Sequence, residues 1–131
     1  MDRRLKVVVV DDEEVILDTI RDLLQKENYD VITYLSAVEA LQDIRKGDTD
    51  IVLTDLMMSE MDGLELMKAI REFQPEIPII MITGYATIHT ARHAKKLGAF
   101  DHVAKPFSMA DLKDVVRRAA DQVESSGTEV N

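Results

Sequence analysis

Five short apolar segments alternate along the chain with longer segments whose apolar residues recur every three to four positions. The first segment, 5–10, reads Leu-Lys-Val-Val-Val-Val and ends at Asp11 and Asp12. A strand with apolar residues at consecutive positions is buried on both faces, as in parallel sheets. The other four predicted strands are 30–34, 51–54, 77–82 (with Pro78 at its start) and 100–104.

The segments between the strands have the spacing of amphipathic helices. Ser36, followed three residues later by Glu39, predicts a capping box at the start of the second helix. Gly47 and Gly98 are expected to end the second and fourth helices, the fourth spanning about 87–97. Ser108 is expected to cap the last helix, which carries apolar residues as far as Val123.

Strands that alternate with helices predict an α/β fold of the (βα)5 type. We expect a doubly wound parallel sheet with helices on both faces and the flavodoxin-like strand order 2-1-3-4-5. The length of 131 residues favours a single domain. It is predicted over residues 1–124, followed by a polar tail, 125–131, that is expected to be disordered.

Composition narrows the classes of function. With 25 acidic and 16 basic residues the formal charge is −9, which argues against general nucleic-acid binding but does not exclude a small basic patch on one face. The absence of cysteine excludes disulfides, thiolate metal sites and cysteine nucleophiles. No signal peptide or membrane-spanning segment is evident, so a cytoplasmic location without a membrane partner is expected.

Chemically useful residues follow four of the five predicted strands. They are Asp11 and Asp12 after the first strand, Asp55 after the third, Thr83 after the fourth and Lys105 after the fifth. The carboxyl ends of parallel strands meet at one edge of the sheet, where open α/β sheets bind ligands. Three converging carboxylates repel one another, and Mg2+ would relieve that conflict while also binding phosphate oxygens. The set therefore predicts a site at which Asp55 becomes an acyl phosphate, assisted by Thr83 and Lys105.

Each of these signals has another interpretation in isolation. Asp11 and Asp12 could cap the next helix. Asp55 could be a turn residue, and Lys105-Pro106 could simply fix a turn. Their combination at four strand ends favours the phosphoryl site.

The same motifs resemble the receiver domain of two-component response regulators, from about residue 5 to residue 123. The stretches that match are 8–13, 54–58, 61–65, 81–86 and 105–107. Stretch 82–107 is most similar to receivers that control AAA+ activators of transcription. The chain is either a stand-alone receiver or a piece of a longer protein.

The resemblance implies a role for each matching residue. Asp55 would accept a phosphoryl group from the phosphohistidine of a sensor histidine kinase. Asp11, Asp12 and Asp55 would hold Mg2+, with the backbone carbonyl of Met57 as a further ligand. Lys105 would pair with the phosphate.

The resemblance also implies how the signal leaves the site. Thr83 would hydrogen-bond the phosphoryl group and move toward it, and the Lys105–Pro106 peptide would be cis. The face formed by the fourth helix, the fifth strand and the fifth helix would then change shape. An unidentified downstream protein, or a second copy in a homodimer, would read that face. Direct nucleic-acid binding is not expected.

Two positions depart from the family pattern. Ser59 stands where the family usually has proline. The loss of proline loosens the loop. His102 stands where the family usually has Tyr or Phe, and it either swings inward as that ring does or lies on the surface of an edge strand.

Met57 and Tyr85 flank the route of a hydrolytic water in the family. Neither is an acid or an amide, so slow self-dephosphorylation is expected.

Other interpretations of the chain differ in class. A phosphatase or mutase with an aspartate nucleophile usually has a second Asp two residues later, where this chain has Met57. A nucleotide-binding module would need a glycine-rich loop after the first strand, which is absent. A degenerate receiver would act only as a protein-interaction module.

Two groups of side chains also allow a second interpretation. His89 and His93 have the spacing of a metal-binding pair, but a solvated helix face is favoured because no third ligand is evident. Met57, Met58 and Met61 either form an adaptable partner surface or pack within their loop.

Overall fold

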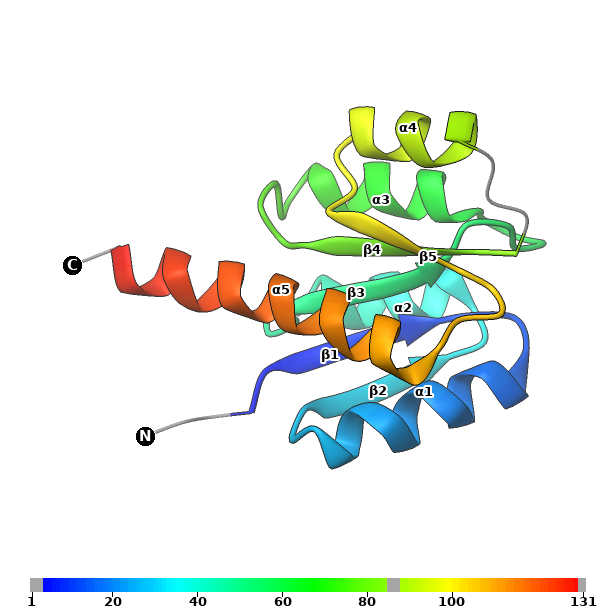
Figure 1. The fold of residues 1–131 in the computed structure, drawn as a ribbon. Coiled ribbons are helices and arrows are strands. Elements are labelled where there is room, and N and C mark those ends of the chain that lie inside the picture. The colour runs from blue at the N-terminus through cyan, green and yellow to red at the C-terminus, as the bar shows by residue number, and fades with distance from the viewer. Residues whose placement is uncertain (1–3, 85–87, 130–131) are drawn as a thin grey trace.

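The structure, a computed structural model, describes residues 4–84 and 88–129 and contains one five-stranded parallel sheet with a helix after each strand (Figure 1). The strands are β1 (Lys6–Val10), β2 (Asp30–Tyr34), β3 (Ile51–Asp55), β4 (Ile79–Thr83) and β5 (Asp101–Ala104). The helices are α1 (Glu14–Lys26), α2 (Ala37–Ile44), α3 (Gly63–Arg71), α4 (Ile88–Lys96) and α5 (Met109–Glu129). The strand order is β2-β1-β3-β4-β5, so the predicted α/β class and topology are confirmed.

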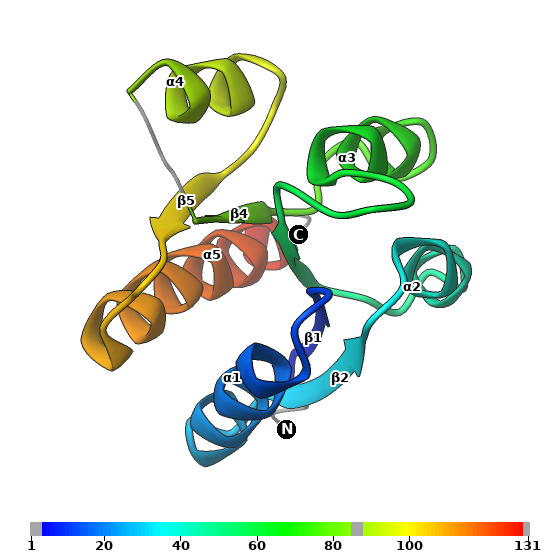
Figure 2. The same cartoon turned by 90° about the vertical axis from the view of Figure 1, so that its right-hand side faces the viewer.

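Helices cover both faces of the sheet and create two apolar cores (Figure 2). Val7 and Val9 of β1 pack in the core formed with α1 and α5, whereas Val8 and Val10 pack in the core formed with α2 and α3. Successive strand side chains point to opposite faces, and all four valines are buried. The uninterrupted valine run of β1 is therefore explained by burial on both sides.

The register between β1 and β3 determines where the functional edge of the sheet lies. Val10 is paired with Thr54 across the two parallel strands. The next residues, Asp11 and Asp55, therefore leave the sheet side by side at its carboxyl edge. This is the switch point at which the chain turns from one half of the sheet to the other.

The strand β4 and the helix α5 have bounds that differ from the predicted ones. β4 begins at Ile79 and not at Ile77, because Pro78 has no N–H for the sheet ladder. The last helix continues to Glu129, past Ser125, where the expected polar tail begins. Once a helix is formed, each further residue adds a hydrogen bond, and no proline interrupts the sequence here.

The helix caps are partly as predicted. Ser36 Oγ accepts a hydrogen bond from the Glu39 N–H at 3.3 Å, which is one half of the predicted capping box. The complete box is at α3, where Asp62 and Glu65 bond to each other's backbone N–H. Ser108 accepts from the backbone of α5 as expected. None of the described helices is both long and apolar enough to cross a membrane.

Candidate functional site

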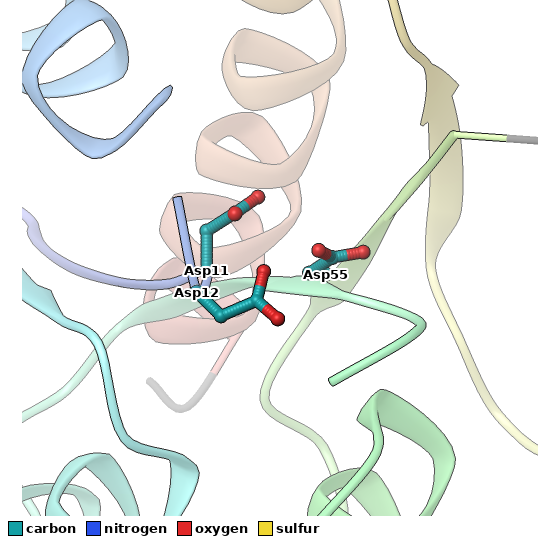
Figure 3. Close-up of side chains that lie close together, drawn as sticks. All are labelled: Asp11, Asp12 and Asp55. Atoms are coloured by element: carbon teal, nitrogen blue, oxygen red, sulfur yellow. The ribbon is translucent and has the colours of Figure 1, made fainter. Parts of the chain in front are cut away.

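Three carboxyl groups converge at the carboxyl edge of the sheet and form what we call the acidic site: Asp11, Asp12 and Asp55 (Figure 3). One oxygen from each residue lies within 4.8 Å of the others. Asp11 and Asp12 directly follow β1, and Asp55 is the last residue of β3. Asp11 and Asp55 are buried, whereas Asp12 is exposed and forms the side open to solvent.

Asp11 joins the acidic site to the start of α1. Its Oδ1 accepts a hydrogen bond from the backbone N–H of Glu13 at 2.8 Å. Its buried Oδ2 accepts no aligned hydrogen bond, and the positive charge nearest to it is the ammonium of Lys105, with Nζ 3.0 Å away. One oxygen of Asp11 therefore fixes the loop while the other faces the site.

Asp55 is 5% exposed and is fixed from two sides. Its Oδ1 accepts a hydrogen bond from the Met57 N–H at 3.2 Å, and its Oδ2 lies 3.3 Å from Lys105 Nζ. Burial and the charge of Asp11 raise the pKa of Asp55, and the Met57 N–H and Lys105 only partly offset this. Asp55 is therefore a carboxylate whose negative charge the surrounding protein compensates incompletely.

Lys105 is the positive group of the site. It follows β5, and its backbone N–H donates to the Thr83 carbonyl at 2.7 Å. Besides Asp11 and Asp55, its ammonium lies 3.8 Å from a carboxylate oxygen of Glu13. Burial lowers the pKa of Lys105, but the ion pairs with Asp11 and Asp55 outweigh burial and raise it overall, so the side chain is charged at neutral pH. The peptide bond to Pro106 is cis.

Thr83 ends β4 and carries a buried hydroxyl group. The residue is 2% exposed, and its Oγ1 has no hydrogen-bond partner in the described part of the chain. The adjacent strand β3 carries Asp55, which is paired with Ile82, the residue before Thr83. An unpartnered buried hydroxyl beside a carboxylate can donate to an oxygen of a ligand that binds there.

The acidic site has the chemistry of a site for a hard divalent cation. Oxygen ligands from carboxylates suit Mg2+, which retains part of its water shell. The buried Asp11 Oδ2 and the raised pKa of Asp55 both indicate negative charge that a cation would stabilise. The residues present therefore fit Mg2+.

Three further predicted residues, Met57, Ser59 and His102, lie at the protein surface. His102 is on the surface of the edge strand β5, with its side chain 40% exposed and Nδ1 3.5 Å from Asp101 Oδ1. Met57 is 72% exposed, and Ser59 is exposed in the same loop. Tyr85 lies outside the described residues.

The structure shows where the methionines of the loop and the two histidines of α4 lie. Met58 and Met61 pack against the core formed with α2 and α3, as the loop-packing interpretation requires. His89 and His93 are exposed on α4. Within residues 4–84 and 88–129, the three aspartates of the acidic site are the only group of three metal-ligating side chains.

Gly63 supports the site and was not identified from the sequence. It begins α3, and its N–H donates to the Leu56 carbonyl at 2.9 Å. A Cβ on this residue would lie 2.6 Å from the backbone oxygen of Asp55. The sequence signal was the Asp62-Gly63 pair at a helix start, which alone does not indicate such close contact.

A second charged group, which we call the Lys6 network, lies on the α2 side of the sheet. Lys6 Nζ donates to Asp43 at 2.8 Å and to Asp48 at 2.9 Å, and the Tyr34 hydroxyl donates to Asp43 at 2.6 Å. Burial, together with Asp43, raises the pKa of Tyr34 to about 12. The signal for this network was Asp43 on the otherwise apolar face of its helix.

Comparison with known proteins places this site in a family context. Residues 7–117 match the family described as the response regulator receiver domain. The chain is 32% identical over 127 residues to the transcriptional regulatory protein ZraR of Salmonella typhimurium, which covers 97% of this chain and 29% of ZraR. It is 31% identical over 113 residues to the sporulation initiation phosphotransferase F of Bacillus subtilis, covering 86% of this chain and 91% of that protein.

A solved structure of a receiver domain is similar to this chain in fold and in sequence. The receiver domain of NtrX from Brucella abortus superimposes with a TM-score of 0.82 at 36% identity, covering 88% of this chain and 98% of that one. The similarity to ZraR and to NtrX confirms the resemblance drawn from residues 82–107 to receivers of AAA+ activators. The chain spans less than a third of the length of ZraR.

Proposed function

This chain belongs to the response regulator receiver domain family, and from that premise we propose that it is a signalling switch in which Asp55 takes a phosphoryl group from the phosphohistidine of a sensor histidine kinase. Domains of this family are phosphoacceptors of two-component signalling, bind Mg2+ at an acidic pocket, and interact with histidine kinases and downstream effectors. The specific donor, cation and output are the parts that we propose for this chain.

The observation that carries the proposal is the setting of Asp55. One oxygen is held by the Met57 N–H, and the other faces Lys105. In the transfer, this second oxygen forms a bond to phosphorus while the bond from phosphorus to the imidazole nitrogen of the donor breaks. Lys105 would offset the charge that develops on the phosphoryl oxygens, and the Thr83 hydroxyl would donate to one of them.

Mg2+ would be held by Asp11, Asp12 and Asp55, with the backbone carbonyl of Met57 as a further ligand. When bound, it neutralises negative charge on the carboxylates and the phosphoryl oxygens and so permits the two anions to approach. Lys105 alone cannot do this, because it already compensates Asp11 and Asp55.

Thr83 and Lys105 would transmit the change to the surface. Their backbones are joined by the bond from the Lys105 N–H to the Thr83 carbonyl. A phosphoryl group that attracts both side chains would therefore move the ends of β4 and β5 together and shift the α4–β5–α5 face. This is a shift between two populations caused by a local change of charge. His102 on β5 would move with that face.

A downstream protein, or a second copy of the chain in a phosphorylation-dependent homodimer, would read the altered face. ZraR is a transcriptional regulatory protein by name, and control of transcription through a separate or attached effector is the output that we propose here. The alternative, a phosphorylation-independent interaction module, is disfavoured by the convergence of Asp11, Asp55 and Lys105.

Phosphorylation by a small donor tests the proposal. Wild-type protein should incorporate label from radiolabelled acetyl phosphate in the presence of Mg2+, and EDTA should abolish it. Asp55→Asn should incorporate none, whereas Asp22→Asn, which alters an exposed aspartate of α1, should behave as wild type. Equal labelling of Asp55→Asn and wild type would contradict the assignment, and an unlabelled wild type would favour the interaction module.

A further inference from the structure

Helix α4 differs in charge from the rest of the chain. Its sequence contains Arg92, Lys95 and Lys96 together with His89 and His93, and no acidic residue. The whole chain carries a formal charge of −9. A concentrated positive segment on an acidic protein produces a local field of opposite sign to its surroundings.

The basic side chains of α4 share a surface. His89, Arg92, His93 and Lys96 are spaced i, i+3, i+4 and i+7, which places them along one side of a helix, and Lys95 flanks this row. All five are exposed. The row is about 10 Å long at the rise of an α-helix, which is the length of two turns of a partner helix. We call these five residues the basic face.

The cations of the basic face are not compensated within the protein. Arg92, Lys95 and Lys96 make no ion pair to any residue that the structure describes. On α5 the opposite holds, since Arg117 pairs with Asp114 and Arg118 pairs with Asp101 as well as Asp114. The charge of α4 is thus available to a partner, whereas much of the charge of α5 is already satisfied.

Helix α4 is connected along the chain to the two strands that lead to Thr83 and Lys105. Ala94 is its one buried side chain among those whose burial is described. The helix lies at a corner of the molecule beside β5 (Figure 2). It lies between β4, which ends at Thr83, and β5, which leads to Lys105. A change at either residue can therefore be passed along the chain to α4.

We propose that the basic face of α4 is the docking site for an acidic segment, helical over about two turns, of the downstream protein. This inference rests on the proposed signalling function and specifies the chemistry of its partner. Carboxylates spaced i, i+3, i+4 and i+7 along the segment match the row on α4. Their attraction guides the encounter and determines which partner binds.

Two other occupants fit the surface less well. A second copy would present its β5 and α5, where Asp101 and Asp114 are already paired with Arg118. A nucleic acid would meet a protein of net charge −9. Nucleic-acid binding depends on a broad positive surface.

Binding of a synthetic helical peptide tests whether the basic face is a docking site for an acidic helix. The probe carries glutamates at i, i+3, i+4 and i+7, and a second peptide of identical composition has them distributed around the helix. The protein, phosphorylated with acetyl phosphate, is titrated and followed by amide chemical shifts and fluorescence anisotropy. We expect shifts at α4, weaker binding as ionic strength rises, and clearly weaker binding of the second peptide. Equal binding of both peptides would overturn the proposal.

Two double charge-reversal variants, one on α4 and one elsewhere on the surface, test whether the peptide binds at the basic face. Arg92→Glu with Lys96→Glu should weaken the patterned peptide roughly tenfold. Lys26→Glu with Lys68→Glu, exposed cations on α1 and α3, should change the affinity less than about twofold. Equal losses in the two pairs would overturn the proposal. So would tighter binding of a DNA duplex at α4, or displacement of the peptide by an α4-dependent dimer.

The variants are first checked for native circular dichroism and for labelling of Asp55. Labelling that is unchanged in the Arg92/Lys96 pair separates the two proposals. Loss of peptide binding with intact labelling supports the docking site. Intact labelling with unaltered peptide binding overturns the docking site while the signalling function stands.

Discussion

A Cβ on Gly63 would lie 2.6 Å from the backbone oxygen of Asp55, closer than real Cβ atoms approach other atoms. The same Cβ would lie 3.0 Å from the Leu56 Cα, so the obstruction is backbone and cannot rotate away. The start of α3 is therefore packed directly against the strand end that carries the proposed phosphoacceptor.

Gly63→Ala should destabilise the protein and lower the labelling of Asp55. Alanine is normally the better helix residue, but here the clash must displace either α3 or the end of β3. The expected cost is about 1–3 kcal/mol in the free energy of unfolding, measured with urea. Gly84→Ala is the control, since a Cβ there meets nothing within 4 Å. A Gly63→Ala protein as stable as wild type would show that α3 can adjust.

Lys105→Met should bind Mg2+ more tightly than wild type while accepting phosphate more slowly. Its ammonium lies 3.0 Å from Asp11 Oδ2 and 3.3 Å from Asp55 Oδ2, so it both compensates the carboxylates and repels a divalent cation. Its removal should raise the Mg2+ affinity roughly tenfold and lower the melting temperature without Mg2+. Calorimetric titration measures the affinity.

Lys113→Met is the matched control, because its ammonium lies 3.8 Å from Glu27 at the surface, away from the acidic site. It should leave both the Mg2+ affinity and the labelling rate unchanged. Weaker Mg2+ binding in Lys105→Met would show that the lysine organises the site more than it opposes the cation.

Met57→Glu should shorten the lifetime of the aspartyl phosphate. Met57 is 72% exposed beside Asp55 and has no group that could orient a water molecule. A carboxylate at this position can accept a proton from water and should accelerate hydrolysis at least several-fold. Val15→Glu adds the same charge at an exposed position of α1 and should have little effect. Loss of the label from wild type within seconds would contradict the expected slow hydrolysis.

The Lys6 network should make stability depend on acid pH through Asp43. Burial raises the pKa of Asp43, but hydrogen bonds from Lys6 and Tyr34 outweigh burial and bring it below the ordinary value. A carboxyl group with a lowered folded pKa stabilises the fold above its unfolded pKa. This contribution is lost as pH falls through the folded pKa.

Asp43→Asn should therefore cost about 1–3 kcal/mol at pH 7, and the difference from wild type should shrink as pH falls below about 4. Urea unfolding at several pH values measures both. Asp48→Asn alters the exposed partner of Lys6 and should cost less than about 1 kcal/mol. A difference between Asp43→Asn and wild type that is equal at pH 7 and pH 3 would exclude the ionised Asp43 as its source.

Several features of the site could be predicted because they are local. Asp55 ends a strand whose four preceding residues are buried, and Lys105 follows the last strand. Parallel pairing brings such ends to one edge whatever the details of packing. The sequence alone cannot give the distance between the charged groups of Lys105 and Asp55, because these residues are 50 positions apart in the chain.

Where the prediction failed, the competing cause was structural context. Ser36 and Glu39 fit the capping-box pattern, yet only the bond from the Glu39 N–H to Ser36 Oγ forms, and the same hydroxyl donates to Glu60 of a distant loop. His102 could face inward or outward by sequence, and here it is exposed beside Asp101. Both outcomes depend on neighbours that are remote in the chain or on the edge position of β5.

The sequence by itself determined the elements, their order and the identity of the acidic site, because periodic burial and strand-end chemistry are written in consecutive residues. Only the tertiary structure decided that Gly63 presses on Asp55, that Lys6 reaches Asp43 across 37 positions, and that the cations of α4 stay unpaired among the described residues. These relationships depend on distances between separate elements, and packing of the two cores against the sheet sets those distances.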